Sequence, residues 1–474
     1  MITRRTFTSG LIALSVAPSI FIKKATANTT AYDTLPIPPI LENISDQKGK
    51  VKYKIAVEEG ITEFIKGVKT STLGYNGNLL GPTLRAKKGD EVEVTVINKL
   101  KEETTVHWHG MLLPGEMDGG PHQRIAPGKE WTAKWVISQP AATVWYHPHG
   151  IGTTAKQVYW GLGGLFILDD EVSTRLNIPS SYGINDIPLV IQDKRFTDNG
   201  EMVYLTNMRD IMFGMMGNTV LVNGAIEPTK IVPAEMIRFR ILNGSNARTY
   251  NFKFDNGMTF YQIATDGGFL EAPVKLSTLR LSPGERAEIL VDFSNYKTGD
   301  TVSLEDQGYK FLHIKVEQAK NIHYNLPDKL VALEKIPEHT ATNERYFSLN
   351  GMGHMVNING KKMNINRIDE FVKIGSTEIW NITADMGMHG MMMGQTSRNS
   401  VIHNFHAHGT MFQIISRNGK TPPLNEQGWK DTVALRNGER VRVIAKFQHK
   451  GLFMYHCHIL EHEDNGMMGQ FSVS

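Results

Sequence analysis

Short segments in which apolar and polar residues alternate recur along most of the chain, and they constrain its fold more than any other feature. The segments Glu-Val-Glu-Val-Thr-Val-Ile at residues 91–97 and Arg-Val-Arg-Val-Ile-Ala-Lys at 440–446 are typical. A period of two is that of a β-strand with one buried face, and Gly, Pro and Asn separate the segments as turn residues do. No long helical pattern competes, so we predict an all-β protein.

Two sets of turns indicate that the strands form a unit repeated three times. Turns centred on Gly128, Gly284 and Gly438 each open an alternating segment, and these glycines are 156 and 154 residues apart. Asn-Gly pairs form the second set, at residues 76–77, 223–224 and 359–360. The length of 474 residues suits about three domains of ~150 residues. We therefore predict three consecutive β-sandwich domains, at residues 28–172, 173–335 and 336–474.

The N-terminus reads as an export signal. Twin arginines, Arg4 and Arg5, precede an apolar stretch at residues 11–22, and Ala25-Thr-Ala27 resembles a cleavage site. We predict a twin-arginine signal peptide at residues 1–27, export of the folded chain by the twin-arginine machinery and a periplasmic location; a basic pair before a core helix is the alternative. The apolar stretch is too short to span a bilayer, and no other stretch looks transmembrane.

Composition excludes a nucleic-acid-binding protein and a protein stabilised by disulfides. Lys and Arg number 51 against 48 Asp and Glu, so the net charge of +3 provides no electrostatic footprint for nucleic acid. A single cysteine excludes an intrachain disulfide framework.

Histidine is concentrated in four clusters, which lie only in the first and third repeats. Two residues of a strand that are two apart share one face, so each His-x-His pair presents both imidazoles on the same side. Four such clusters indicate a metal site, although imidazole alone does not select copper, zinc, iron or nickel. The clusters contain His107 and His109; His147 and His149; His403, His406 and His408; and His456 and His458, with His462 beyond.

Cys457 favours copper. A blue-copper site uses two His, one Cys and a weak axial ligand that is often Met, and His403, Cys457, His462 and Met467 supply that set. Structural zinc sites usually contain more thiolates, and a histidine on each side of the cysteine fits ligation better than catalysis by a lone nucleophile.

The residues beside Cys457 also predict a connection between two sites. If residues 456–458 are extended, Cys457 points one way and both neighbouring imidazoles point the other. Eight histidines then remain, which is enough for three copper ions with positions left open for oxygen. Because they come from the first and third repeats, we expect their cluster where those repeats meet.

The four clusters resemble, in order, the ligand motifs of the multicopper oxidases, and the chain is most similar to the bacterial copper-efflux (cuprous) oxidases. Segments that carry the resemblance include Glu102-Glu-Thr-Thr-Val-His-Trp-His-Gly110, Gly428-Trp-Lys-Asp-Thr432 and Glu461-His-Glu-Asp-Asn-Gly-Met-Met468. The resemblance implies three cupredoxin-like Greek-key domains, the second without copper ligands. It also implies four copper ions, held as type 1 by His403, Cys457, His462 and Met467, as type 2 by His107 and His406, and as a type 3 pair by His109, His147, His149, His408, His456 and His458.

Two carboxylates match positions that the family uses to deliver protons. Asp118 lies in Gly-Glu-Met-Asp-Gly-Gly, and Glu463 adjoins the predicted ligand His462. Carboxylates near a cationic cluster are suited to relaying protons. The alternatives are that Asp118 caps a turn and that Glu463 is a solvated charge.

A methionine-rich segment precedes His403. If Asn381 corresponds to Asn98 of the first repeat, the segment is an insertion over the site where electrons enter. Thioethers prefer Cu(I), so we predict Cu(I) contacts here, with a hydrophobic lid as the alternative; a second cluster, Met208 to Met216, reads as core. The predicted contacts are Asp385, Met386, Met388, Met391, Met392 and Met393.

We therefore predict an oxidase that couples oxidation of Cu(I) to reduction of O2 to water and serves copper tolerance. A laccase-like oxidase of phenols or aromatic amines is the main alternative. A non-enzymatic relative would have lost ligands, and a copper nitrite reductase does not need four clusters. One chain supplies every predicted ligand, so we expect a monomer.

Overall fold

Three β-sandwiches follow one another in the computed structural model, which describes residues 30–320, 322–386 and 400–474. The predicted signal peptide and residues Met388, Met391, Met392 and Met393 lie outside the described residues. The first sandwich pairs a sheet of β1 (Lys50–Glu63), β2 (Lys69–Tyr75), β4 (Glu91–Asn98) and β6 (Glu130–Val136) with a sheet of β3 (Leu84–Lys87), β5 (His107–His109), β7 (Ala142–His147) and β8 (Gly164–Asp169).

The second sandwich has the largest sheet. That sheet contains β9 (Asp186–Phe196), β10 (Met202–Val203), β11 (Thr219–Val222), β12 (Ala225–Ile226), β14 (Met236–Asn243), β16 (Phe260–Thr265), β17 (Gly268–Leu276) and β19 (Arg286–Asp292). The opposite sheet contains β13 (Thr229–Pro233), β15 (Tyr250–Phe254), β18 (Leu279–Leu281), β20 (Thr301–Asp306) and β21 (Tyr309–Glu317).

The third sandwich packs two five-stranded sheets. One contains β22 (Asn343–Asn350), β23 (Asn357–Ile358), β25 (Thr377–Asp385), β27 (Phe412–Arg417) and β29 (Arg440–Lys446). The other contains β24 (Glu370–Val372), β26 (Val401–Ala407), β28 (Thr432–Arg436), β30 (Gly451–His456) and β31 (Met468–Val473). The prediction of an all-β fold of three sandwiches is confirmed.

Helices occur only in connections within the described ranges. They are α1 (Thr154–Tyr159), α2 (Glu171–Arg175), α3 (Met208–Phe213) and α5 (Leu460–Asp464), with short 3-10 turns such as η1 (Gly115–Met117) and η3 (Gly353–Met355). None of the described helices has the length and apolar character needed to cross a bilayer.

The alternating pattern of the sequence becomes alternating burial. In β4 the valines at 92, 94 and 96 are fully buried, while the residues between them face outward. Each sandwich buries its own apolar core. Burial of apolar area at about 25 cal/mol per Å² is the main force that closes such sheets.

The repeated turns have the same geometry in each domain. Gly128, Gly284 and Gly438 have φ of +70°, +81° and +71°, the left-handed region that glycine adopts without strain. The Asn side chains of the Asn-Gly pairs accept equivalent backbone hydrogen bonds, each of 2.7 Å, from Ala56, Val190 and Ser348.

One detail of the repeat alignment was wrong. The N–H groups of Gly128, Gly284 and Gly438 donate to the carbonyls of Asn98, Asn243 and Ala384, respectively. Ala384 and not Asn381 therefore corresponds to Asn98. The strand ladders agree, because Ile97 pairs with Glu130, Leu242 with Arg286 and Thr383 with Arg440.

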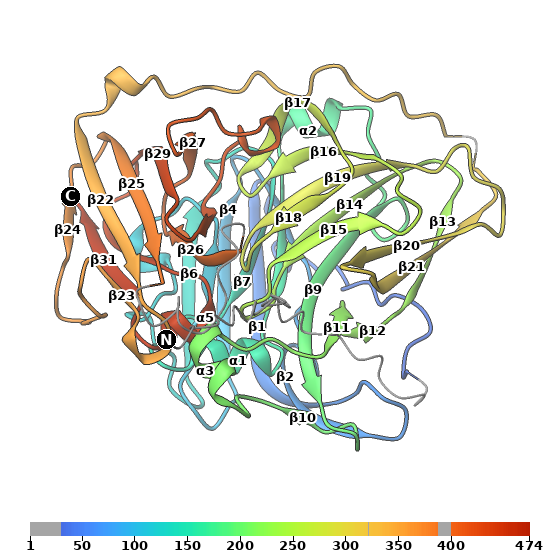
Figure 1. The fold of residues 1–474 in the computed structure, drawn as a ribbon, viewed down its shortest axis with the longest axis horizontal. Helices are drawn as coiled ribbons and strands as arrows, with labels where there is room; N and C mark the ends of the chain where they lie inside the picture. Colours follow the sequence, from blue (N-terminus) through green and yellow to red (C-terminus); the bar gives the residue numbers. More distant parts are fainter. Residues whose placement is uncertain (1–29, 321, 387–399) are drawn as a thin grey trace, which may run out of the picture.

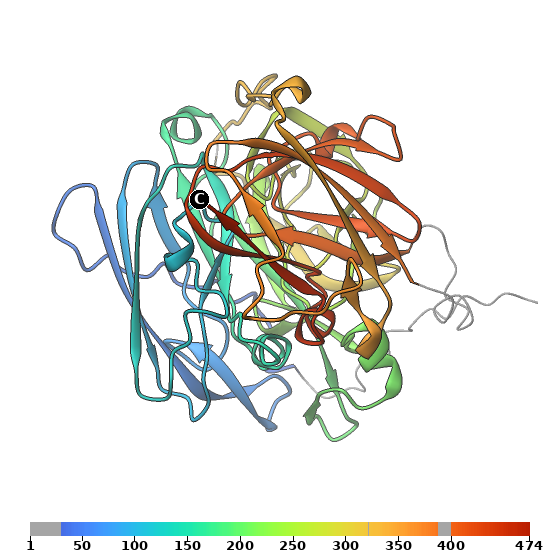
Figure 2. The ribbon, with the colours of Figure 1, turned by 90° about the vertical axis from the view of Figure 1, so that its left-hand side faces the viewer.

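The three sandwiches surround a common junction. In Figure 1 the third domain, in orange and red, lies beside the second, in yellow and green; Figure 2 shows the first domain, in blue and cyan, against both. The outward face of β14 is buried at this junction. There Arg240 donates hydrogen bonds to Asp186 of its own domain and to Thr143 of the first domain. Buried pairs of this kind orient the domains through charge-assisted hydrogen bonds.

Candidate metal centre

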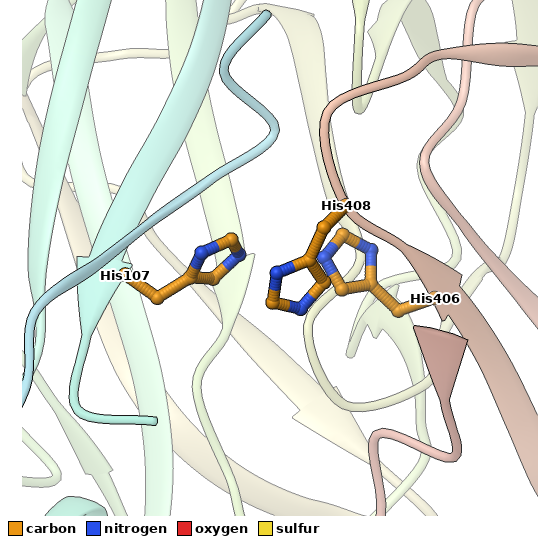
Figure 3. Close-up of side chains that lie close together, drawn as sticks. All are labelled: His107, His406 and His408. Atoms are coloured by element: carbon orange, nitrogen blue, oxygen red, sulfur yellow. The ribbon is translucent and has the colours of Figure 1, made fainter. Parts of the chain in front are cut away.

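Eight of the predicted ligands meet between the first and third domains. His107 and His109 alternate with Trp108 on β5, so both imidazoles leave the core that Trp108 enters. The β5–β7 ladder sets His107 opposite His147, and the β26–β30 ladder sets His406 opposite His456. Figure 3 shows His107 facing His406 and His408 across the domain boundary. All eight side chains, His107, His109, His147, His149, His406, His408, His456 and His458, are buried; we call them the histidine cage.

Two groups of three imidazoles converge within the cage. Nε2 of His456 lies 3.1 Å from Nε2 of His149 and 3.1 Å from Nε2 of His408. On the other side, Nδ1 of His109 lies 3.3 Å from Nε2 of His147, and the His458 ring centroid is 5.0 Å from that of His109. Together the two groups contain the six histidines that the family resemblance assigns to the type 3 pair.

The remaining two ligands, His107 and His406, face each other with their ring centroids 5.8 Å apart. The Nδ1 atoms of these rings lie 2.9 Å from the carbonyls of Asp118 and Asp431, respectively. Their Nε2 atoms are buried and have no hydrogen-bond partner among the described residues. Buried nitrogens of this kind need a partner, and a metal ion between the rings would provide it.

Four of the cage histidines are held in the form that binds metals. Burial, reinforced by neighbouring imidazoles, lowers the pKa of His109, His147, His406 and His408 well below the ordinary value. A neutral imidazole offers a lone pair to a cation.

The second set of predicted ligands lies inside the third domain. Sγ of Cys457 is 3.7 Å from Nδ1 of His403 and 3.9 Å from Nδ1 of His462. Met467 is also fully buried, and its carbonyl accepts the backbone N–H of Cys457. Burial raises the pKa of the Cys457 thiol to about 12. A bound cation is therefore needed to stabilise the thiolate, which is the form that ligates a metal.

Residues 456–458 join the two sets. Cys457 faces His403 and His462, while its two neighbours belong to the cage. The side chains thus diverge as the alternation of an extended segment predicts. Asn404 supports the junction, because its Oδ1 accepts the backbone N–H of His458 at 2.7 Å and lies 3.6 Å from Sγ of Cys457.

Buried carboxylates surround the cage. Oδ2 of Asp118 lies 2.7 Å from Nδ1 of His408, and Oε2 of Glu463 lies 3.1 Å from Nδ1 of His456. Burial opposes the ionisation of Glu463, but His149 and His456 outweigh it and hold its pKa at about 2. Glu463 is only 1% exposed, so the alternative of a solvated charge is wrong; Asp118, 2% exposed, follows the η1 turn and also contacts the cage.

Profiles of the multicopper oxidase family match residues 56–173, 177–302 and 326–474, which together cover most of the chain.

The chain belongs to the multicopper oxidase family.

Individual relatives agree over more than nine tenths of the chain. Multicopper oxidase mco of Staphylococcus haemolyticus is 43% identical over 437 residues, 92% of each chain. Cell division protein FtsP of Escherichia coli is 34% identical, with 93% of this chain and 92% of the relative covered.

Solved structures have the same fold. A laccase from Pediococcus acidilactici is 36% identical with a TM-score of 0.87 over 94% of each chain. A multicopper oxidase of Campylobacter jejuni, described as a metallo-oxidase, is 30% identical with a TM-score of 0.78 over 96% of this chain and 100% of the other. The expected cupredoxin-like fold, the family and the oxidoreductase class are confirmed, and copper is the cofactor of the family.

The methionines of this multicopper oxidase divide into core and surface positions. Met386 is 3% exposed and packs in the core of the third domain, so in this conformation it does not offer its thioether to solvent. Asp385 ends β25 and pairs with Asn350 in the ladder. In the second cluster Met215 is buried as expected, but Met208 is 66% exposed, so the core interpretation was wrong there.

Sequence reasoning missed two contacts of the oxidase's metal centre. Nε2 of His462 lies 3.0 Å from the carbonyl of Met212, so α3 of the second domain covers this ligand. Oδ1 of Asp431 lies 3.0 Å from Nε2 of His109. Asp431 belongs to a segment noted for its family resemblance, but the sequence does not indicate that it reaches a histidine of another domain.

Proposed function

We propose that this oxidase couples the oxidation of Cu(I) to the reduction of dioxygen, in the balance 4 Cu(I) + O2 + 4 H⁺ → 4 Cu(II) + 2 H2O. The observation that supports the proposal most is the position of Cys457, whose thiol belongs to one ligand set while its two neighbours belong to the other. A chain built in this way connects an electron-accepting site with the histidine cage.

The ligand sets fit four copper ions. His403, Cys457, His462 and Met467 would hold type 1 copper, His107 and His406 type 2 copper, and the two groups of three histidines the type 3 pair. Bound copper would supply the one-electron redox chemistry and the affinity for dioxygen. A cysteine with two histidines is the donor set of blue copper.

Electrons would pass along the chain itself. The backbone of residues 456–458 covalently joins the Cys457 side to the cage, and Asn404 fixes its direction. Since this path is one continuous buried segment, electron transfer along it requires no rearrangement of the protein.

Glu463 and Asp118 are the groups that would move protons. Oε2 of Glu463 lies 3.1 Å from Nδ1 of His456, and Oε1 lies 3.5 Å from Nε2 of His149. Asp118 reaches the opposite part of the cage through His408. Carboxylates within hydrogen-bond distance of a reaction site are effective proton donors and acceptors.

Cu(I) is the reductant that the surroundings of His462 favour. Its side chain is fully buried, and α3 covers its Nε2. An aromatic substrate is therefore kept from direct contact with His462, whereas a small ion bound on the surface of α3 can transfer its electron to His462 across that helix. Exposed thioethers at Met208 and Met355 lie on α3 and η3, two elements that contact each other, and thioethers are ligands for Cu(I).

Oxidation of phenols is the second candidate, because a protein named laccase is 36% identical to this chain. Oxygen uptake driven by Cu(I) and by a phenol distinguishes the two. Replacing Met388, Met391, Met392 and Met393 by Leu keeps the length of the segment and removes the thioethers. If Cu(I) is the substrate, we expect the KM of this variant for Cu(I) to be about tenfold higher than that of the parent, which corresponds to ~1.4 kcal/mol of binding free energy. Its phenol kinetics should be unchanged. Unchanged Cu(I) kinetics would reject the role of this segment.

Export and copper tolerance complete the proposal. We propose that the twin arginines direct the folded chain, as a monomer, to the periplasm, where it lowers the concentration of Cu(I). Replacing Arg4 and Arg5 by Lys should retain the enzyme in the cytoplasm and make cells sensitive to copper. Normal export of that variant would contradict the assignment.

A further inference from the structure

The turn at residues 282–286 differs from its counterparts in the other domains. All five of its residues are buried, whereas the corresponding turns expose their glycine and the residue two positions later: Glu130 in the first domain and Arg440 in the third. Arg286 occupies that position in the second domain and is 1% exposed. The second domain supplies none of the predicted copper ligands, yet its turn lies at the centre of the molecule.

This turn contacts both parts of the metal centre. The carbonyl of Pro283 accepts a hydrogen bond of 2.7 Å from the side chain of Asn404, the residue that holds the backbone of His458. A Cβ on Gly284 would lie 3.0 Å from the His458 ring, so the turn packs directly on that ligand.

Arg286 connects the turn to the cage through Asp431. Its Nη1 and Nη2 donate to the two carboxylate oxygens of Asp431 at 2.8 and 2.6 Å. Backbone carbonyls accept its remaining donors, among them Thr143 of the first domain at 3.1 Å. Asp431 Oδ1 in turn lies 3.0 Å from Nε2 of His109. The series Arg286–Asp431–His109 therefore passes through all three domains.

The contact with Asp431 decides which nitrogen His109 offers to a metal. A neutral imidazole has one N–H and one lone pair. If Nε2–H donates to the carboxylate, the lone pair is on Nδ1, the atom that lies 3.3 Å from Nε2 of His147. In His107, His147 and His406 a backbone carbonyl contacts Nδ1 instead. In these rings Nδ1 therefore carries the proton and Nε2 carries the lone pair.

We propose that Arg286 and Asp431 are positioning residues that fix His109 with Nδ1 facing the copper site. The second domain thereby controls the type 3 pair without contributing a ligand. This inference rests on the proposed assignment of copper ions to the histidine cage. Hydrogen-bonded partners of ligating histidines set the tautomer and ring orientation, and their loss typically costs 10- to 100-fold in metal affinity.

Copper retention and absorption test the proposal without measuring turnover. Asp431→Asn keeps the shape of the side chain but can donate to Nε2, which would move the proton of His109 to Nδ1. Arg286→Lys keeps the charge but loses the two-pronged contact. We expect both variants to retain the blue absorption of copper bound by Cys457. They should lose the near-ultraviolet absorption of the type 3 pair at a chelator concentration about 10- to 100-fold below that needed for the parent.

Arg248→Lys is the matched control. Arg248 is a buried arginine of the same domain that donates to Asp193 at 2.8 Å and contacts no predicted ligand. It should behave like the parent. If Arg248→Lys also loses the near-ultraviolet absorption, or if Asp431→Asn retains it as the parent does, the positioning role is wrong.

Thr432→Val is the milder variant to use if Asp431→Asn does not fold. The Thr432 hydroxyl donates to Oδ1 of Asp431 at 2.8 Å, so its loss should weaken the same absorption to a smaller extent. No loss in both Thr432→Val and Arg286→Lys would overturn the proposal. If the parent itself binds copper at Cys457 but none in the cage, the proposed function fails first, and the result is distinguishable from failure of the positioning role alone.

Discussion

The Cys457 site and the histidine cage are built in different ways. His403, Cys457, His462 and Met467 lie within one domain, and Cys457 and Met467 are members of its apolar core. The cage lies between the first and third domains and is surrounded by carboxylates. Arg286 of the second domain holds one of these carboxylates, Asp431.

The difference teaches which forces maintain each site. Packing inside the third domain brings the four residues of the Cys457 site together, and α3 of the second domain covers only His462 among the contacts described above. Docking of three domains and a set of buried hydrogen bonds determine the cage. Substitutions should therefore be able to damage one site and leave the other unchanged.

The largest effect is expected from Cys457→Ser, which removes the thiolate at which the proposed electron path begins. Oxidase activity should fall to background and the blue absorption should disappear. The near-ultraviolet absorption of the cage should persist, because its eight ligands remain. Activity with Cu(I) in this variant would show that electrons enter the cage by another path.

Glu463→Gln should have the next largest effect, because it removes a proposed proton-transfer group and none of the predicted ligands. General acid–base groups contribute about 10²- to 10⁴-fold, so we expect turnover to fall at least ~100-fold with normal copper content. Glu461→Gln is the control. Glu461 is a buried carboxylate of the same helix, and its oxygens accept hydrogen bonds from Tyr204, Asn246 and the backbone of Met215. Equal losses in both variants would contradict a specific role for Glu463.

Asp118→Asn should affect the cage alone. The charged contact of its Oδ2 with His408 becomes a neutral one, while its backbone carbonyl still faces His107. We expect a loss of about 10- to 100-fold in copper affinity of the cage, measured by chelator titration, with normal blue absorption. Asp90→Asn changes another buried aspartate of the first domain, which accepts from the backbone of Lys87, and should leave the cage intact.

The smallest effect concerns the glycine turns. Gly128→Ala and Gly284→Ala introduce a Cβ at similar positive φ, which should lower the free energy of unfolding by roughly 1–2 kcal/mol in each case. Only the second Cβ meets a ligand, at 3.0 Å from His458, whereas the first has nothing within 4 Å. The near-ultraviolet absorption should therefore change in Gly284→Ala only; a change in both variants would indicate a general effect of strain.

The sequence predicted the parts of the centre that follow local rules. Alternation on a strand predicted the opposed directions of Cys457 and its neighbours, and the repeated turns predicted three sandwiches. It did not predict Arg286, because the same turn position is exposed in the other two domains. The sequence also did not predict that α3 covers His462, because this contact depends on how the second domain docks against the third.

Diffraction from copper-loaded crystals, recorded on both sides of the copper absorption edge, tests the central claim most directly. The account predicts one anomalous peak between Cys457, His403 and His462, and three peaks in the cage on the opposite side of residues 456–458. Absence of copper from the cage, or a Cys457 thiol without a metal, would contradict it.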